Sequence, residues 1–198
     1  MNQFFKWFNS KNDLDGLIRA AVAHFWFVTI HPFDDGNGRI ARAISDLALA
    51  QDESLAKRCY SVSSQISHDR NNYYDILEKS QKGNVDITDW IIWFLETLVR
   101  AIERSEIIIG KTVLIGNFWK KYSQVELSER QRKVIQKMLE SEPEGFVGGM
   151  TNRKYVGLTR TSPASAKRDL GDLEEKGLLK RNESKGRSIS YSLVLKAK

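Results

Sequence analysis

Two apolar segments joined by a short polar loop make up most of the first fifty residues. Apolar side chains recur at helical spacing from Leu14 to Val28 and again from Ile40 to Ala48. The intervening His31-Pro32 step ends the first helix, because proline disfavours helical backbone at the residue before it. We therefore expect a buried helix over 14–30, capped by Asp13, and a second buried helix over 39–51.

Helical patterns continue along most of the chain. The sequence has only three prolines, and 41% of its residues are apolar, which together favour a mainly α protein with a real core. Further helices are expected over 2–9, 71–80 and 88–118, and Gly83 should end the second of these. The apolar stripe that begins at Trp90 is interpreted as core and not as a cofactor site.

The last third of the chain has a different pattern. Ser128 should cap a helix over 129–140, and two more helices are expected over 151–156 and 162–176, the last followed by Gly177. Alternating apolar positions up to residue 194 predict a two-stranded hairpin. Three helices followed by a hairpin describe a winged helix-turn-helix, so we expect two domains, 1–120 and 121–198.

The net charge of +6 is concentrated in the second of these domains. Residues 128–198 hold 16 Lys and Arg against 9 Asp and Glu, which gives +7 and leaves −1 for residues 1–127. Basic side chains gather at the start of the expected recognition helix and in the wing. They suit contact with DNA phosphates through residues 151–190, although such modules also dock proteins or form a homodimer.

A reducing, cytoplasmic location fits the cysteine content. Cys59 is the sole cysteine, so no internal disulfide can form. The longest apolar run, 17–30, is interrupted by Arg19 and His24 and is shorter than the ~20 residues of a membrane span. We expect no contact with a membrane.

The loop at 31–42, HPFDDGNGRIAR, combines groups that suit phosphate chemistry. Gly36 and Gly38 let backbone N–H groups approach an anion, and the helix N-terminus adds free donors and partial positive charge. Arg39 and Arg42 share one helical face and suit a polyphosphate. Each feature alone is usually structural; the hypothesis of a phosphate site depends on their combination.

The same loop offers a metal ligand and a base. Either Asp34 or Asp35 could bind Mg²⁺, which commonly uses one or two carboxylates plus phosphate oxygens. Histidine is a common general base, and His31, just before the loop, could accept a proton from an attacking hydroxyl.

This loop resembles the signature of the Fic family, H-P-F-x-(D/E)-G-N-G-R-x-x-R, at every defined position. The similarity extends over about residues 1–120, including YYDILEKSQKG at 73–83, and the tail resembles the winged helix of some bacterial Fic proteins. The resemblance implies a helical catalytic domain that transfers AMP from ATP to a hydroxyl of a target protein. His31 would be the general base, and Asp35 would bind Mg²⁺, since Asp34 occupies the variable place.

The resemblance also implies the nucleotide contacts. Gly36, Asn37 and Gly38 would hold the α-phosphate, and Arg39 and Arg42 the outer phosphates. A glycine at position 38 is typical of the AMP-transferring branch, because relatives that phosphorylate their target have lysine there.

Three further positions complete the expected site. Phe33 would be a buried anchor under the loop. Tyr73 and Gln81 match positions that line the nucleotide pocket in relatives, although Tyr73 is equally typical of a core residue.

Two family features are missing from the sequence. No β-hairpin flap precedes His31, and no (S/T)-x-x-x-E-(G/N) inhibitory motif occurs, since Glu140 stands where the nearest match would need Ser or Thr. The sequence therefore looks like the C-terminal part of a longer protein, with Arg42 unrestrained and target docking impaired. Two alternatives stay open: a DNA-binding regulator whose Fic domain senses nucleotide, and a Fic enzyme that removes AMP.

Overall fold

The computed structural model describes residues 1–10, 14–53, 58–83, 85–183 and 189–195. The chain divides into two compact units, Met1–Ile107 and Ile108–Lys198. Helix α6 (Thr88–Lys121) begins in the first unit and ends in the second. The domain boundary expected after residue 120 therefore lies at the end of this helix, whereas the compact units divide within it.

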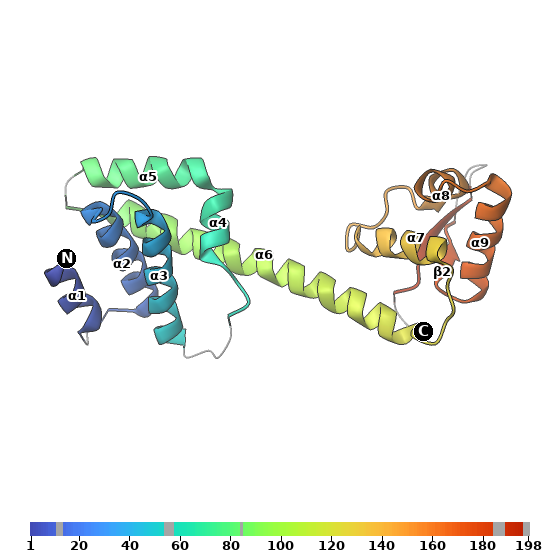
Figure 1. The fold of residues 1–198 in the computed structure, drawn as a ribbon, viewed down its shortest axis with the longest axis horizontal. Coiled ribbons are helices and arrows are strands. Elements are labelled where there is room, and N and C mark those ends of the chain that lie inside the picture. The colour runs from blue at the N-terminus through green and yellow to red at the C-terminus, as the bar shows by residue number, and fades with distance from the viewer. Residues whose placement is uncertain (11–13, 54–57, 84, 184–188, 196–198) are drawn as a thin grey trace. The chain divides into compact units, whose positions relative to one another are not determined.

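The first unit is a bundle of helices. Besides the start of α6 it contains α1 (Asn2–Asn9), α2 (Gly16–Ile30), α3 (Asn37–Glu53), α4 (Val62–His68) and α5 (Arg70–Lys82). Figure 1 shows α2 and α3 side by side. Ala20 and Ala21 of α2 and Ala41 and Ala48 of α3 are fully buried, and such small side chains let two helices approach closely.

The core of the first unit forms around aromatic rings of α1, α2 and α6. Trp90, Phe94 and Phe4 are at most 1% exposed, and the indole N–H of Trp90 donates to the carbonyl of Ala21 at 2.9 Å. This bond satisfies the one polar atom of a fully buried tryptophan. The interpretation of the Trp90 stripe as core is confirmed.

The second unit combines three helices with a small sheet. The helices are α7 (Glu129–Leu139), α8 (Asn152–Thr159) and α9 (Pro163–Glu175). The strands β1 (Met150–Thr151), β3 (Ser190–Leu193) and β2 (Leu179–Arg181) pair antiparallel in that spatial order. The predicted hairpin is present, and β1 adds a third strand that the sequence pattern did not reveal.

Local signals explain most helix ends. Ser128 caps α7 through a reciprocal bond with Gln131, whose N–H lies 3.3 Å from the serine hydroxyl. Gly177, with φ +72°, follows α9 in the left-handed conformation that glycine favours. Asp15 caps α2, because its carboxylate accepts from the N–H of Leu17 at 2.9 Å. The expected cap, Asp13, lies outside the described residues.

The mainly α fold is confirmed, but one helix was missed. The short helix α4 contains three serines and a histidine and lacks a long apolar stripe, so periodicity gave no signal. Ser61 caps it by accepting from the N–H of Ser64 at 3.1 Å. Among the described helices, none combines the length and apolar character needed to cross a membrane.

Candidate functional site

The loop between α2 and α3 turns sharply at both ends. His31 adopts φ 49° and ψ 57°, a left-handed conformation unusual for a residue with a side chain, and its N–H still donates to Phe27 at 3.2 Å. Gly36 has φ +89°, where any side chain would be strained. Helix α3 then begins at Asn37, so the loop 31–36 leads directly into a helix N-terminus.

Asn37 fixes the shape of this loop. Its side chain is 2% exposed, its Oδ1 accepts from the N–H of Phe33 at 3.1 Å, and its Nδ2 donates to the carbonyl of Phe33. Both polar ends of the amide are therefore used inside the loop. What Asn37 can offer an anion is its backbone N–H.

The first turn of α3 carries backbone groups that suit an anion. The N–H groups of Asn37, Gly38 and Arg39 precede the first intrahelical bond, which runs from Ile40 to Gly36 at 3.0 Å. Unpaired first-turn N–H groups and the helix dipole favour a negative charge at this point. A Cβ on Gly38 would lie 3.5 Å from the Nη1 of Arg42, so this guanidinium lies beside the start of α3.

The charged side chains of the loop are exposed. Asp35 and Arg39 form an ion pair at 2.9 Å, with 91% and 72% of their side chains accessible. Asp35 also accepts from the N–H of Gly36 at 2.6 Å. Arg42 is half-buried and makes no ion pair with any residue in the described ranges. The solvent-exposed ion pair between Asp35 and Arg39 contributes little to stability, so a ligand could bind either side chain at a small cost in free energy.

His31 has one ring nitrogen free. Its Nδ1 lies 3.3 Å from the carbonyl of Val28, an atom that can only accept. In the neutral ring Nδ1 therefore carries the proton, and Nε2 keeps its lone pair. Because His31 is exposed, Nε2 is available to take a proton from another molecule.

The expectation of a buried Phe33 is wrong. Its side chain is 51% exposed, and its ring centroid lies 6.4 Å from that of Phe27 at the surface of the bundle. The backbone of Phe33 is held by Asn37, so the loop keeps its shape without burying the ring.

Tyr73 lies beneath Arg42 in a buried polar chain. It is 3% exposed, and its hydroxyl lies 3.1 Å from Nε2 of the fully buried His24, whose Nδ1 lies 2.9 Å from the hydroxyl of Ser45. Ser45 donates its own proton to the carbonyl of Ala41 at 2.9 Å. The proton order follows: Tyr73 donates to His24, which donates to Ser45.

Burial of this chain shifts two pKa values. Burial first, and then the nearby charge of Arg42, lowers the pKa of His24 to about 3. Burial likewise raises the pKa of Tyr73 to about 12, although Arg42 acts in the opposite direction. His24 is thus a neutral structural histidine that joins α2, α3 and α5.

This shift predicts a pH-dependent stability. Because the folded pKa of His24 lies below its ordinary value of 6.5, the unfolded chain takes up a proton that the folded chain refuses. The stability that neutral His24 provides is complete above pH 6.5 and falls toward pH 3, by about 1.4 kcal/mol per pH unit. Urea unfolding between pH 7 and 4 should show this slope in the wild type and lose it in His24→Gln. The exposed control His68→Gln should keep it, and equal slopes in all three chains would contradict the assignment.

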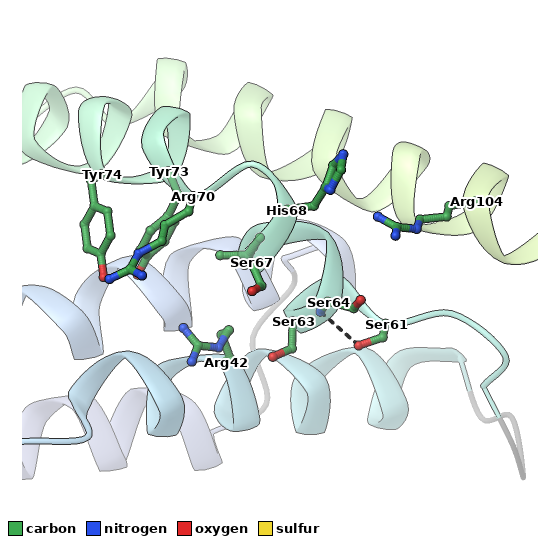
Figure 2. A pocket seen from close by; sticks show the side chains of 11 residues that line it. Arg42, Ser61, Ser63, Ser64, Ser67, His68, Arg70, Tyr73, Tyr74 and Arg104 are labelled. Atoms are coloured by element: carbon green, nitrogen blue, oxygen red, sulfur yellow. Dashed lines mark hydrogen bonds between the residues drawn. The ribbon is translucent and has the colours of Figure 1, made fainter.

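The predicted pocket residues separate into two places. Arg42 and Tyr73 line a pocket of about 840 Å³ between α3, α4, α5 and α6 (Figure 2). Gln81 lines a different, more apolar pocket of about 630 Å³, where its Nε2 donates to the hydroxyl of Thr29 at 3.0 Å. Thr29 lies two residues before His31, so this second pocket adjoins the start of the loop.

The sequence interpretation did not identify the other polar groups of the 840 Å³ pocket. Arg70, Arg104 and the serines of α4 line it, and none belongs to the signature loop. Helices α4 and α5 follow each other directly in the chain, whereas Arg104 lies in α6 and reaches the pocket only through packing. The one signal in the sequence was the closeness of Arg70 to the expected nucleotide contact at Tyr73.

Comparison with known proteins gives a family match at the N-terminus and relatives that are similar to about half of the chain. The Fic/DOC family model matches residues 1–49, which include the whole loop. A protein adenylyltransferase Fic from Aedes aegypti is 37% identical over 87 residues, covering 43% of this chain and 16% of the relative. One from Nematostella vectensis is 34% identical over 107 residues, covering 53% and 22%.

The chain thus spans no more than about a fifth of the length of these two relatives. A crystal structure of a Fic family protein from Desulfovibrio desulfuricans aligns with 99% of this chain and 54% of its own, at a TM-score of 0.47 and 18% identity. Residues 1–49, which contain the loop 31–36, helix α2 and most of helix α3, are the part that is similar to the Fic/DOC family model.

Proposed function

We propose that the first unit transfers AMP from ATP to a hydroxyl side chain of a target protein. One observation supports this most: a base with a free Nε2, the unpaired N–H groups at the start of α3 and a half-buried arginine all lie within residues 31–42. The similarity of residues 1–49 to a family whose relatives are named protein adenylyltransferases points the same way.

In the proposed reaction His31 acts as the general base. Its Nε2 takes the proton of a Ser, Thr or Tyr hydroxyl as that oxygen forms a bond to the α-phosphorus of ATP. The bond between the α-phosphorus and the bridging oxygen breaks, and pyrophosphate leaves. The N–H groups of Asn37 and Gly38 and the guanidinium of Arg42 stabilise the charge that develops on the phosphate oxygens.

A magnesium ion fits the loop if the nucleotide supplies most of its ligands. Asp35 offers one exposed carboxylate, and the described residues contain no cluster of three acidic, His or Cys side chains that could hold a metal alone. Mg²⁺ commonly binds through one or two carboxylates, water and phosphate oxygens. Bound there by Asp35, the ion would neutralise phosphate charge.

The pocket at Gln81 suits the base of the nucleotide. Phe25, Trp26 and Val85 give it apolar walls, and the amide of Gln81 can hydrogen bond to a ring nitrogen. Tyr73 lines the other pocket together with Arg42, and its hydroxyl is held there by His24. We also expect a cytoplasmic location, where the exposed thiol of Cys59 stays reduced.

The position of the label tests the reaction type. The chain should be incubated with Mg²⁺, lysate and ATP labelled at either the α- or the γ-phosphate. AMP transfer labels protein from the α-position only. Label from the γ-position would indicate phosphorylation, and no label from either, with the fold intact by circular dichroism, would contradict the enzyme assignment.

We further propose that the second unit is a winged helix-turn-helix that binds duplex DNA. Helix α9 begins with Ser162 as its cap and has no acidic residue in its first turn. Arg160, Lys167 and Arg168 are exposed there, and none forms an ion pair within the described ranges. Lys185 and Arg187 of the expected wing lie outside the described residues.

A charge-reducing variant tests DNA binding. Lys167→Ala with Arg168→Ala should weaken binding to duplex DNA and reduce the slope of log K against log salt by about 0.9 per lost phosphate contact. The matched control is Lys133→Ala, an exposed cation of α7. Unchanged binding in the double variant would contradict this surface, and a DNA-free homodimer by light scattering would favour protein docking instead.

A further inference from the structure

The 840 Å³ pocket of the first unit is lined by positive and hydroxyl groups. Arg42 comes from α3, Arg70 from α5 and Arg104 from α6, and the serines of α4 lie between them (Figure 2). No Asp or Glu lines this pocket. Such a lining attracts anions and repels cations.

The one carboxylate close in sequence is already occupied. Asp69 is the only acidic residue between 61 and 74, and it accepts from Gln65 at 3.0 Å and from Arg100 at 3.1 Å. The hydrogen bond from Gln65 and the charge of Arg100 lower the pKa of Asp69, so it stays ionised within its own pair. It therefore does not neutralise the arginines of the pocket.

Those arginines have no acidic partner of their own. Within the described ranges neither Arg42, Arg70 nor Arg104 forms an ion pair, and the guanidinium of Arg70 lies 5.7 Å from the ring centroid of Tyr74. Like charges that share a partly closed space repel each other, and a bound anion removes that repulsion. Repulsion between these arginines raises the electrostatic free energy of the pocket, and a bound anion lowers it.

The hydroxyl groups favour phosphate over a simple anion. Ser63 and Ser67 are four residues apart on one face of α4, and both line the pocket. Figure 2 shows Ser63 and Ser67 close to Arg42, with Arg70 on the neighbouring helix. Hydroxyl donors together with guanidinium groups match the several oxygens of a phosphate chain.

Arg42 connects this pocket with the loop. Its Nη1 lies 3.5 Å from the position of a Cβ on Gly38, and the same side chain lines the pocket. An anion in the pocket and an anion at the start of α3 can therefore share one guanidinium. The remaining groups, Arg70, Ser63 and Ser67, belong to the pocket alone.

We propose that this pocket is a diphosphate-binding site in which Arg42 and Arg70 hold the phosphates and Ser63 and Ser67 donate hydrogen bonds to them. Two sources supply this chemistry: free inorganic pyrophosphate, and the terminal phosphates of a nucleotide held at the loop. Binding of free pyrophosphate does not depend on AMP transfer; only the second source rests on the proposed function.

Calorimetric titration of the whole chain with pyrophosphate tests the site. The Arg70→Gln variant loses one charge-assisted contact and should bind pyrophosphate about tenfold more weakly. The double variant Ser63→Ala with Ser67→Ala should bind pyrophosphate severalfold more weakly. The control Lys82→Gln removes an exposed cation from the same helix and should change the affinity less than twofold. Arg70 is exposed, so the variant should keep its melting temperature.

Titrations with ATP and AMP separate the two sources. If the pocket takes the terminal phosphates, Arg70→Gln weakens ATP binding by the same factor as pyrophosphate and leaves AMP binding unchanged. If it takes free pyrophosphate, ATP and AMP both bind as in the wild type. Equal pyrophosphate affinities in the wild type and Arg70→Gln, or equal losses in Arg70→Gln and Lys82→Gln, would overturn the proposal. Arg70-dependent pyrophosphate binding without any AMP transfer would instead contradict the proposed function and leave this site standing.

Discussion

The His31→Ala variant is expected to transfer AMP at least about a hundredfold more slowly than the wild-type chain, the scale of a lost general base. In the wild type, Nε2 of His31 keeps a free lone pair, because Nδ1 donates to the carbonyl of Val28. The measurement is incorporation of α-labelled AMP into lysate proteins over time.

Binding of the nucleotide provides the control for this variant. His31 is exposed, so its removal should leave the fold intact, and the first-turn N–H groups of α3 should still bind ATP within a few-fold of the wild-type affinity. Slow transfer with normal binding would identify a chemical role. Transfer at the wild-type rate would show that another group takes the proton.

The Asn37→Ala variant is expected to lose both stability and activity. It leaves the N–H and the carbonyl of Phe33 without their partner, which should cost about 2 kcal/mol of unfolding free energy. Because the loop then loses its shape, AMP transfer should fall by about a hundredfold, as small misplacements of reacting groups can cause. Chemical unfolding and the labelling assay measure the two effects.

Two further variants sharpen this prediction. Asn37→Asp keeps an acceptor for the N–H of Phe33 but lacks the donor for its carbonyl, so its stability should lie between wild type and Asn37→Ala. Asn71→Ala, at an exposed asparagine of α5, should change neither property. If Asn37→Ala were as stable and active as this control, the amide would have no role in holding the loop.

Local signals in the sequence predicted much of the fold. Serine caps, the proline after His31 and the glycine after α9 act within a few residues, so their effects can be recognised from sequence alone. Helix α4 and strand β1 were missed, because the first is short and polar and the second has two residues that need β3 as a partner. Pairing between distant segments leaves no local pattern.

The candidate site was predictable only in part, because groups on consecutive residues can be recognised in the sequence whereas contacts between distant segments cannot. The loop lies on consecutive residues, so its glycines, arginine pair and histidine could be recognised together. That the side-chain amide of Asn37 binds the backbone of Phe33, and leaves its backbone N–H for an anion, was not predicted. The phenyl ring of Phe33, which was expected to be buried under the loop, lies at the surface. Which way a side chain turns in a tight loop depends on backbone angles such as those of His31 and Gly36.

Helix α6 supplies residues to two separate cores. Trp90 and Phe94 of this helix are buried in the first core, and Phe118 is buried in the second. An uninterrupted helix propagates cooperatively, because each added turn extends an existing nucleus. If either core melts, one end of α6 therefore loses its packing while the other core still holds the other end. The free energies of unfolding of the two cores are thus expected to be coupled.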